Sequence, residues 1–259
     1  MSTTDAIHQG DVHFDVDSRG VATITFHHPL SNSLPGRVLK KLAETITEMG
    51  NNNEVKVIVL KSEGEKAFCA GASFDELISI KDLETGKIFF SGFANVINAC
   101  RKAPKFIIGR VQGKAVGGGV GLASAVDYCY ATREASVKLS ELAVGIGPFV
   151  VGPAVERKVG VSGMSRLAID ATTWKSAEWA RDNGLYAEIY DTIEEMDKEV
   201  DILANQLSKS NLEAMKLMKE TIWRGTEDWD SLLAERAAMS GKLVLSEFTV
   251  NAISAFKGK

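Results

Sequence analysis

Histidine is confined to the start of the chain. All four histidines lie within the first 28 of the 259 residues, at positions His8, His13, His27 and His28. A serine-hydrolase triad uses a histidine as its base, and a histidine-rich zinc site needs several imidazole ligands. The body of the protein can supply neither, so both kinds of site are excluded there.

Cysteine, net positive charge and long hydrophobic runs are also scarce. The three cysteines lie far apart and form no Cys-x-x-Cys pair, which predicts free thiols in a reducing compartment and neither disulfides nor a metal site. Lys and Arg total 30 against 34 for Asp and Glu, a net charge of −4, so a nucleic acid is not the expected partner. The longest uncharged stretch, Leu142–Val155, contains three glycines and two prolines and is shorter than the roughly 20 residues of a membrane helix. With no targeting segment at its start, the protein is expected to be cytoplasmic, with no membrane partner.

The sequence does contain a regular succession of β and α patterns. Hydrophobic residues make up 45% and charged residues 25%, as in a globular protein with a full core. Alternation of polar and apolar residues predicts a β-hairpin over Val12–Phe26, and β-branched runs predict buried strands over Val55–Leu60 and Lys105–Val111. The last quarter is helical, so we divide the chain into an α/β core, residues 1–191, and a C-terminal helical region, residues 192–259. Helical spacing predicts helices over Val38–Met49, Ile88–Ala99, Ile193–Leu207, Leu212–Arg224 and Trp229–Leu245.

The two buried strands are each followed by a glycine-bearing turn and the start of a helix. The first turn lies in Ser62–Ser73 and the second in Gly113–Gly121. Such turns leave backbone N–H groups free, and a helix N-terminus favours negative charge. If the strands are parallel, one N–H group from each turn can converge on a single carbonyl oxygen as an oxyanion hole. The alternative is that the glycines only permit tight packing.

Four segments, in order, resemble the crotonase (enoyl-CoA hydratase/isomerase) superfamily, and the resemblance extends from about residue 12 to residue 256. Ser140-Glu141 with the following Gly145–Val150 is closest in pattern to bacterial methylglutaconyl-CoA hydratase-like members. The four segments are His28-Pro29 with Asn32-Ser33-Leu34, then Ala67-Phe68-Cys69-Ala70-Gly71-Ala72, Gly113–Leu122, and Gly184-Leu185 with Ala187.

The resemblance implies an α/β fold: a superhelical core of ββα units with a C-terminal helical region used for trimerisation, giving a homotrimer or homohexamer. It implies an acyl-CoA small molecule as the partner; the coenzyme A thioester is the substrate, with no separate cofactor and no metal. The N–H groups of Ala72 and Gly118 are then the oxyanion hole. The residues expected to lie against the substrate and its CoA portion are Ser31, Ala70, Ala72, Ser73, Phe74 and Gly118.

The carboxylates depart from the family pattern. Hydratases of this family usually carry two glutamates; the first position is Gly121 here, and the second is Glu141. The apolar neighbours of Glu141 are expected to raise its pKa and suit it to proton transfer. The alternative is an exposed glutamate in a turn. Asp75 and Glu76 could take its place, although both are typical of solvated residues at a helix start.

Three functions remain open. The first is hydration of a 2-enoyl-CoA, such as a branched methylglutaconyl-CoA, with Glu141 as the single catalytic carboxylate. The second is a Δ3-to-Δ2 enoyl-CoA isomerase, in which Glu141 moves a proton between two carbons. The third is a non-catalytic homologue that binds acyl-CoA, and the missing carboxylate at Gly121 is its only support.

The C-terminal helices have apolar faces that suggest subunit contacts. Asn211 and Asp228 precede two of these helices and are expected to cap them. So much apolar surface on a terminal region predicts packing between subunits. The two faces consist of Leu212, Met215, Met218 and Ile222, and of Trp229, Leu232, Leu233 and Ala237.

Overall fold

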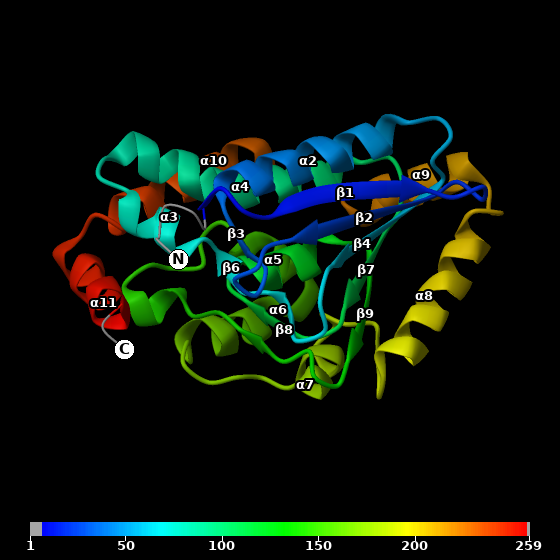
Figure 1. Ribbon diagram of the computed structural model, residues 1–259. Helices are drawn as coiled ribbons and strands as arrows, with labels where there is room; N and C mark the ends of the chain where they lie inside the picture. The colour runs from blue at the N-terminus through cyan, green and yellow to red at the C-terminus, as the bar shows by residue number, and fades with distance from the viewer. Residues whose placement is uncertain (1–6, 258–259) are drawn as a thin grey trace.

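A twisted six-stranded sheet forms the centre of the fold (Figure 1). The computed structural model describes residues 7–257. The first two strands of the sheet pair antiparallel, and every other neighbouring pair is parallel. The expected hairpin and the expected parallel arrangement of the two buried strands are therefore confirmed. In spatial order the strands are β1 (Asp11–Val16), β2 (Val21–His27), β4 (Val57–Ser62), β7 (Ile107–Val111), β9 (Tyr128–Thr132) and β11 (Glu188–Tyr190).

Two smaller parallel sheets lie where the glycine-bearing turns emerge. One has the order β10 (Val137–Lys138), β8 (Lys114–Val116), β5 (Ala67–Cys69), and the other pairs β3 (Ser33–Leu34) with β6 (Gly71–Ala72). The segment containing β5 and β6, expected to be a glycine-bearing loop, forms these short strands. Strands of two or three residues are too short to show the alternation that marks a strand, so these were missed.

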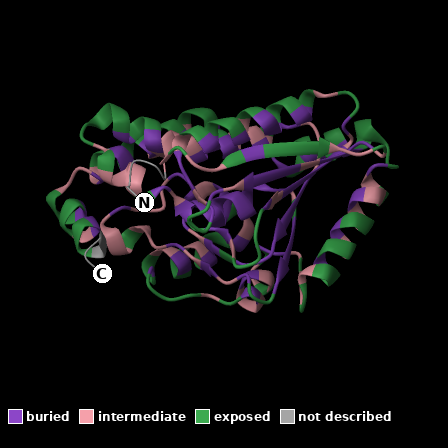
Figure 2. Cartoon of the chain, viewed as in Figure 1, coloured by how far each residue is buried: buried purple, intermediate pink, exposed green. Residues whose placement is uncertain are grey.

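Helices cover both faces of the large sheet. On one face, α2 (Gly36–Asn51) packs on β1 and β2, α4 (Leu83–Lys102) packs on α2, and α10 (Trp229–Leu243) packs on α4. On the other face, α8 (Ile193–Leu207) packs on β4, β7 and β9 through Met196, Val200 and Ala204. Figure 2 shows the inner strands of the sheet as largely buried, and the edge strand β1 and the outer faces of α2 and α8 as largely exposed. The remaining helices are α3 (Phe74–Ser79), α5 (Gly118–Ala125), the 3₁₀ turn η1 (Glu141–Val144), α6 (Gly152–Ile169), α7 (Ala177–Asp182), α9 (Leu212–Ile222) and α11 (Glu247–Lys257).

The C-terminal helices differ from expectation in three ways. The last expected helix, Trp229–Leu245, is present as α10 and ends two residues earlier, at Leu243, and the further helix α11 that follows it was not expected. Asn211 caps α9 by accepting a hydrogen bond from the Ala214 N–H (3.0 Å), whereas Asp228 precedes α10 without a side-chain capping bond. The face of α10 that we expected between subunits is buried within the chain itself, with Leu233 and Ala237 both 0% exposed. That part of the prediction was wrong; α9 keeps an exposed apolar face.

Asp127 is the centre of a buried polar network. Its Oδ2 accepts hydrogen bonds from the Ile107 N–H (2.8 Å) and pairs with Lys219 Nζ (2.9 Å), while its Oδ1 accepts one from Trp223 Nε1 (2.7 Å). Both partners of the ion pair are almost fully buried. The network therefore ties β7 and β9 to α9 and the turn after it.

The three cysteines are free and buried, as expected. Burial raises the pKa of each of the three thiols to about 12, so they are neutral at physiological pH.

Candidate active site

The two glycine-bearing turns meet beside β6 and α5. The Ser73 N–H donates to the Leu34 carbonyl oxygen (2.9 Å), so the preceding N–H, that of Ala72, points away from β3. Gly118 is the first residue of α5 and carries one of the N–H groups that a helix leaves without an internal acceptor. A Cβ atom placed on Gly71 would lie 3.7 Å from the Gly118 nitrogen, which shows that the two turns are in contact.

A cavity of about 410 Å³ opens at these turns. Ala72 and Gly118 both line it, as do Ala70 and Phe74. Most of the wall is apolar and comes from α3, α4, η1 and the start of α6. Its other main lining residues are Leu77, Phe89, Phe90, Phe93, Lys138, Ser140, Glu141, Val144, Ile146, Val150, Val151, Thr172 and Ser240. Residues of both glycine-bearing turns therefore line one cavity.

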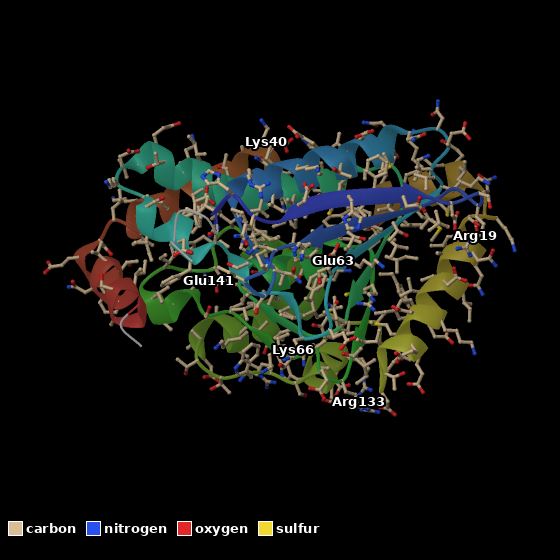
Figure 3. All side chains as sticks on the ribbon, viewed as in Figure 1. Arg19, Lys40, Glu63, Lys66, Arg133 and Glu141 are labelled. Atoms are coloured by element: carbon tan, nitrogen blue, oxygen red, sulfur yellow. The ribbon has the colours of Figure 1, made fainter. Side chains whose placement is uncertain are left out.

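Glu141, the first residue of η1, lines this cavity and is labelled in Figure 3. Its Oε2 is buried and has no hydrogen-bond partner among the residues 7–257. Burial raises the pKa of Glu141 from 4.5 to about 7, although a hydrogen bond to its own backbone N–H acts in the opposite direction. Its Oε1 would lie 3.0 Å from a Cβ atom on Gly117, where the positive φ of +52° also favours glycine. The carboxyl group thus lies against the second turn and is not the exposed turn residue of the alternative interpretation.

At Gly121, the position of the missing second glutamate, Val151 occupies the space that a side chain would need. A Cβ atom on Gly121 would lie only 2.5 Å from Cγ1 and 2.8 Å from Cβ of Val151. A side chain at this position cannot be added without moving the start of α6. Glu141 is the single carboxylate among the described residues that line the cavity.

The turn that carries Glu141 is packed against α11. At Gly145, just after η1, the φ is +81°, and a Cβ atom would lie 2.5 Å from Phe248 Cδ1 and 2.6 Å from Thr249 Oγ1. Ile146 and Ile253 belong to a small apolar cluster that joins η1 to α3, α4 and α11. The position of Glu141 therefore depends on the C-terminal helix of the same chain.

Comparisons with known proteins identify the family of this chain. The sequence matches the family described as enoyl-CoA hydratase/isomerase over residues 17–254. The chain belongs to this family. It is 31% identical over 239 residues to the short-chain-enoyl-CoA hydratase of Clostridium acetobutylicum, a match that covers 91% of this chain and 90% of that protein. It is 28% identical over 254 residues to the mitochondrial methylglutaconyl-CoA hydratase of Mus musculus, covering 95% of this chain and 80% of that protein.

The fold of this enoyl-CoA hydratase/isomerase family member is likewise confirmed. The crystal structure of enoyl-CoA hydratase from Bacillus halodurans superposes with a TM-score of 0.86 at 21% identity, covering 94% of this chain and 99% of that one. The crotonase fold and the enzyme class expected from the sequence are thus both correct.

The other acidic candidates lie outside the cavity wall. Asp75 and Glu76 are in the first turn of α3, as expected. Glu76 is half-buried, and its Oε2 accepts a hydrogen bond from the Gly36 N–H (2.7 Å), which joins α3 to the start of α2. The Ser73 hydroxyl caps α3 by accepting from the Glu76 N–H (3.3 Å) and does not line the cavity.

Ser31 lies just outside the cavity. Its φ of +53° marks a tight turn, and its carbonyl oxygen accepts a hydrogen bond from the Ala70 N–H (3.1 Å). Ser31 lines a neighbouring surface depression with His28 and Asn32. This hydrogen bond connects Ser31 to Ala70, an exposed residue that lines the cavity.

Sequence reasoning missed three parts of the site: Lys138, Val151 and the phenylalanines of α4. Helical spacing marked the α4 phenylalanines as apolar, but an apolar helix face can line a cavity or pack in the core, and the pattern does not distinguish the two.

The described residues contain no cluster of His, Cys, Asp or Glu able to hold a metal ion. Within residues 7–257, no helix is long and apolar enough to cross a membrane.

Proposed function

We propose that this enzyme adds water to the double bond of a 2-enoyl-CoA thioester and catalyses the reverse reaction. The proposal rests on the buried carboxyl group of Glu141. Its Oε2 has no hydrogen-bond partner among residues 7–257, and the group lies beside the two glycine-bearing turns. The relatives named as hydratases, at 28% and 31% identity, support it.

The backbone N–H groups of Ala72 and Gly118 hold the thioester carbonyl oxygen. They stabilise the negative charge that develops on this oxygen when a nucleophile adds at C3. The Glu141 carboxylate accepts a proton from water as the hydroxide adds to C3, and the resulting acid returns that proton to C2. A pKa of about 7 suits a group that must both accept and donate a proton near neutral pH.

A second candidate is isomerisation of a 3-enoyl-CoA to a 2-enoyl-CoA. The contact between Gly121 and Val151 favours it, because it excludes a second carboxylate that could help to hold a water molecule. Glu141 would then remove a proton from C2 and return it to C4, and no water would be consumed.

The test uses 2-enoyl-CoA and 3-enoyl-CoA thioesters of varied length and branching. Hydration removes the absorbance of the conjugated thioester and adds the mass of one water to the product. Isomerisation creates that absorbance and leaves the mass unchanged. No turnover of any thioester, combined with calorimetric binding of acyl-CoA, would refute both candidates and identify a non-catalytic acyl-CoA-binding protein.

We further propose that the enzyme is a homotrimer or a pair of trimers and needs no cofactor besides the CoA of its substrate. The exposed residues Leu217, Met218 and Ile222 of α9 support the subunit contact. Light scattering at micromolar concentration tests the assembly, and a monomer contradicts it. Full activity in the presence of a chelator tests the second part.

A further inference from the structure

The cavity extends along one face of α4. A Cβ atom placed on Gly118 would lie 2.2 Å from Phe93 Cζ, so the Phe93 ring touches the turn that carries the Gly118 N–H group. Gly86 lies on the same face of α4, at the opposite end, because residues at the spacing i, i+3, i+4 and i+7 share one helix face. The residues of this face that line the cavity are Phe89, Phe90 and Phe93.

The other end of this face meets α10 at a contact between two glycines. A Cβ atom on Gly86 would lie 2.9 Å from the Gly241 Cα atom, and a Cβ atom on Gly241 would lie 2.7 Å from the Lys87 nitrogen. The backbones of the two helices therefore touch, and a side chain at either glycine would force them apart. This contact brings Ser240, the residue before Gly241, into the cavity wall.

Ser240 is the single residue of α10 among the described residues that line the cavity. Only 1% of its surface is exposed. The lining residues from α3 and α4 are all larger and apolar, whereas serine is a small side chain. The position of Ser240 is thus the point on this wall where a larger side chain would reduce the space for a bound molecule.

The length of the α4 face limits the chain that fits along it. Gly86 and Phe93 are seven residues apart, which corresponds to about 10 Å along a helix axis. Helix side chains lean towards the N-terminus, so the path from the Phe93 ring to Ser240 is shorter than this. An extended alkyl chain, with bonds of about 1.5 Å and angles near 111°, advances about 1.25 Å per carbon. The path therefore has room for at most about eight carbons.

We propose that Ser240 closes the far end of the acyl pocket and determines chain length. The preferred substrates are then enoyl-CoA thioesters with a straight aliphatic acyl chain of up to about eight carbons. The proposal rests on the proposed function in one respect, which is the placement of the thioester carbonyl at Ala72 and Gly118. The phenylalanines of α4 bind the chain by burying its methylene groups.

Binding of saturated acyl-CoA thioesters tests this without any turnover. Calorimetry of the unmodified enzyme should show an affinity that rises about fourfold per added carbon from butanoyl-CoA to octanoyl-CoA. Dodecanoyl-CoA should bind no more tightly than octanoyl-CoA. Ser240→Leu enlarges the side chain by about two non-hydrogen atoms, so it should weaken octanoyl-CoA binding by about tenfold to twentyfold and leave butanoyl-CoA binding unchanged.

Two smaller substitutions separate the size of the side chain from the loss of the hydroxyl group. Ser240→Val, which is intermediate in size, should weaken octanoyl-CoA binding by about fourfold, and Ser240→Ala should not weaken it. Equal weakening by Ser240→Ala and Ser240→Leu would assign the effect to the hydroxyl group and overturn the proposal.

Ser231→Leu is the matched control, because Ser231 lies on the same helix, is exposed and does not line the cavity. This variant should bind the whole series like the unmodified enzyme. Equal weakening of butanoyl-CoA and octanoyl-CoA by Ser240→Leu would show a general disturbance of the site and overturn the proposal. So would unchanged octanoyl-CoA binding, or an affinity that continues to rise to dodecanoyl-CoA in the unmodified enzyme. Failure to turn over any enoyl-CoA would refute the proposed function and leave this binding result standing.

Discussion

Glu141→Gln tests the proposed catalytic role of Glu141 and the effect of its burial on stability in one variant. A buried carboxyl group is costly to ionise, and the glutamine side chain cannot ionise at all. Glutamine keeps the size of the side chain but cannot accept a proton. If Glu141 transfers the proton, turnover should fall by about 10²- to 10⁴-fold. Binding of a saturated acyl-CoA should survive, since the proposed oxyanion hole consists of the backbone N–H groups of Ala72 and Gly118, which the substitution leaves in place.

The same substitution should change how stability depends on pH. Burial raises the pKa of Glu141 from 4.5 to about 7, and each pKa unit corresponds to about 1.4 kcal/mol. The neutral carboxyl group favours the folded state fully below pH 4.5, where both states are protonated. As the pH rises to about 7, the unfolded chain loses its proton first, and the free energy of unfolding falls by at most about 3 kcal/mol. The glutamine side chain of the variant has no proton to lose.

Urea unfolding of both proteins at pH 5 and pH 8 measures this effect. Relative to the unmodified enzyme, the variant should gain about 2 to 3 kcal/mol of stability between pH 5 and pH 8. Comparing the two pH values cancels the constant cost of burying the glutamine amide without a partner. An equal stability difference at both pH values would show that the pKa of Glu141 is not raised. Loss of acyl-CoA binding together with turnover would show that Glu141 only supports the structure.

Three further substitutions test the packing around the site. Gly121→Glu should lower the free energy of unfolding by about 1–3 kcal/mol through its clash with Val151, and a rise in hydration rate would contradict this account. Lys219→Met leaves Asp127 buried without its counter-ion; urea unfolding should show a loss of about 3 kcal/mol, while turnover per folded molecule stays unchanged because the pair lies outside the cavity wall. Gly145→Ala, at a φ of +81° and pressed against α11, should lower both the melting temperature and the turnover number, and an unchanged turnover number would show that η1 does not need α11.

The large strands and helices could be predicted because their patterns are long. The run Val55–Leu60 is apolar on both faces of the sheet, and the helical spacing over Ile193–Leu207 places apolar residues on one helix face. The structure has β4 and α8 there. β5 and β6 could not be predicted, because pairing with distant segments and not local pattern makes them strands.

Backbone geometry and the family resemblance pointed to three residues that the structure brings together. Ala72, Gly118 and Glu141 lie at one cavity, as expected. The contact of Val151 with Gly121 depends on how α6 packs on α5, and no local pattern records it. The burial of the α10 apolar face within the chain could not be predicted from the sequence either. An apolar helix face indicates that something packs on it, but does not identify whether that is another helix of the chain or another subunit.

The packing of α11 on η1 makes assembly of the active site a late event in folding. Gly145 and Thr249 are neighbours in space but lie roughly a hundred residues apart in the sequence. Contacts with such separation close slowly, because a long loop must first lose its freedom. A refolding chain should therefore recover the buried contact between Trp223 and Trp229 before it recovers activity. In that interval Glu141, the proposed proton-transfer group, has no fixed position because η1 does not yet pack against α11.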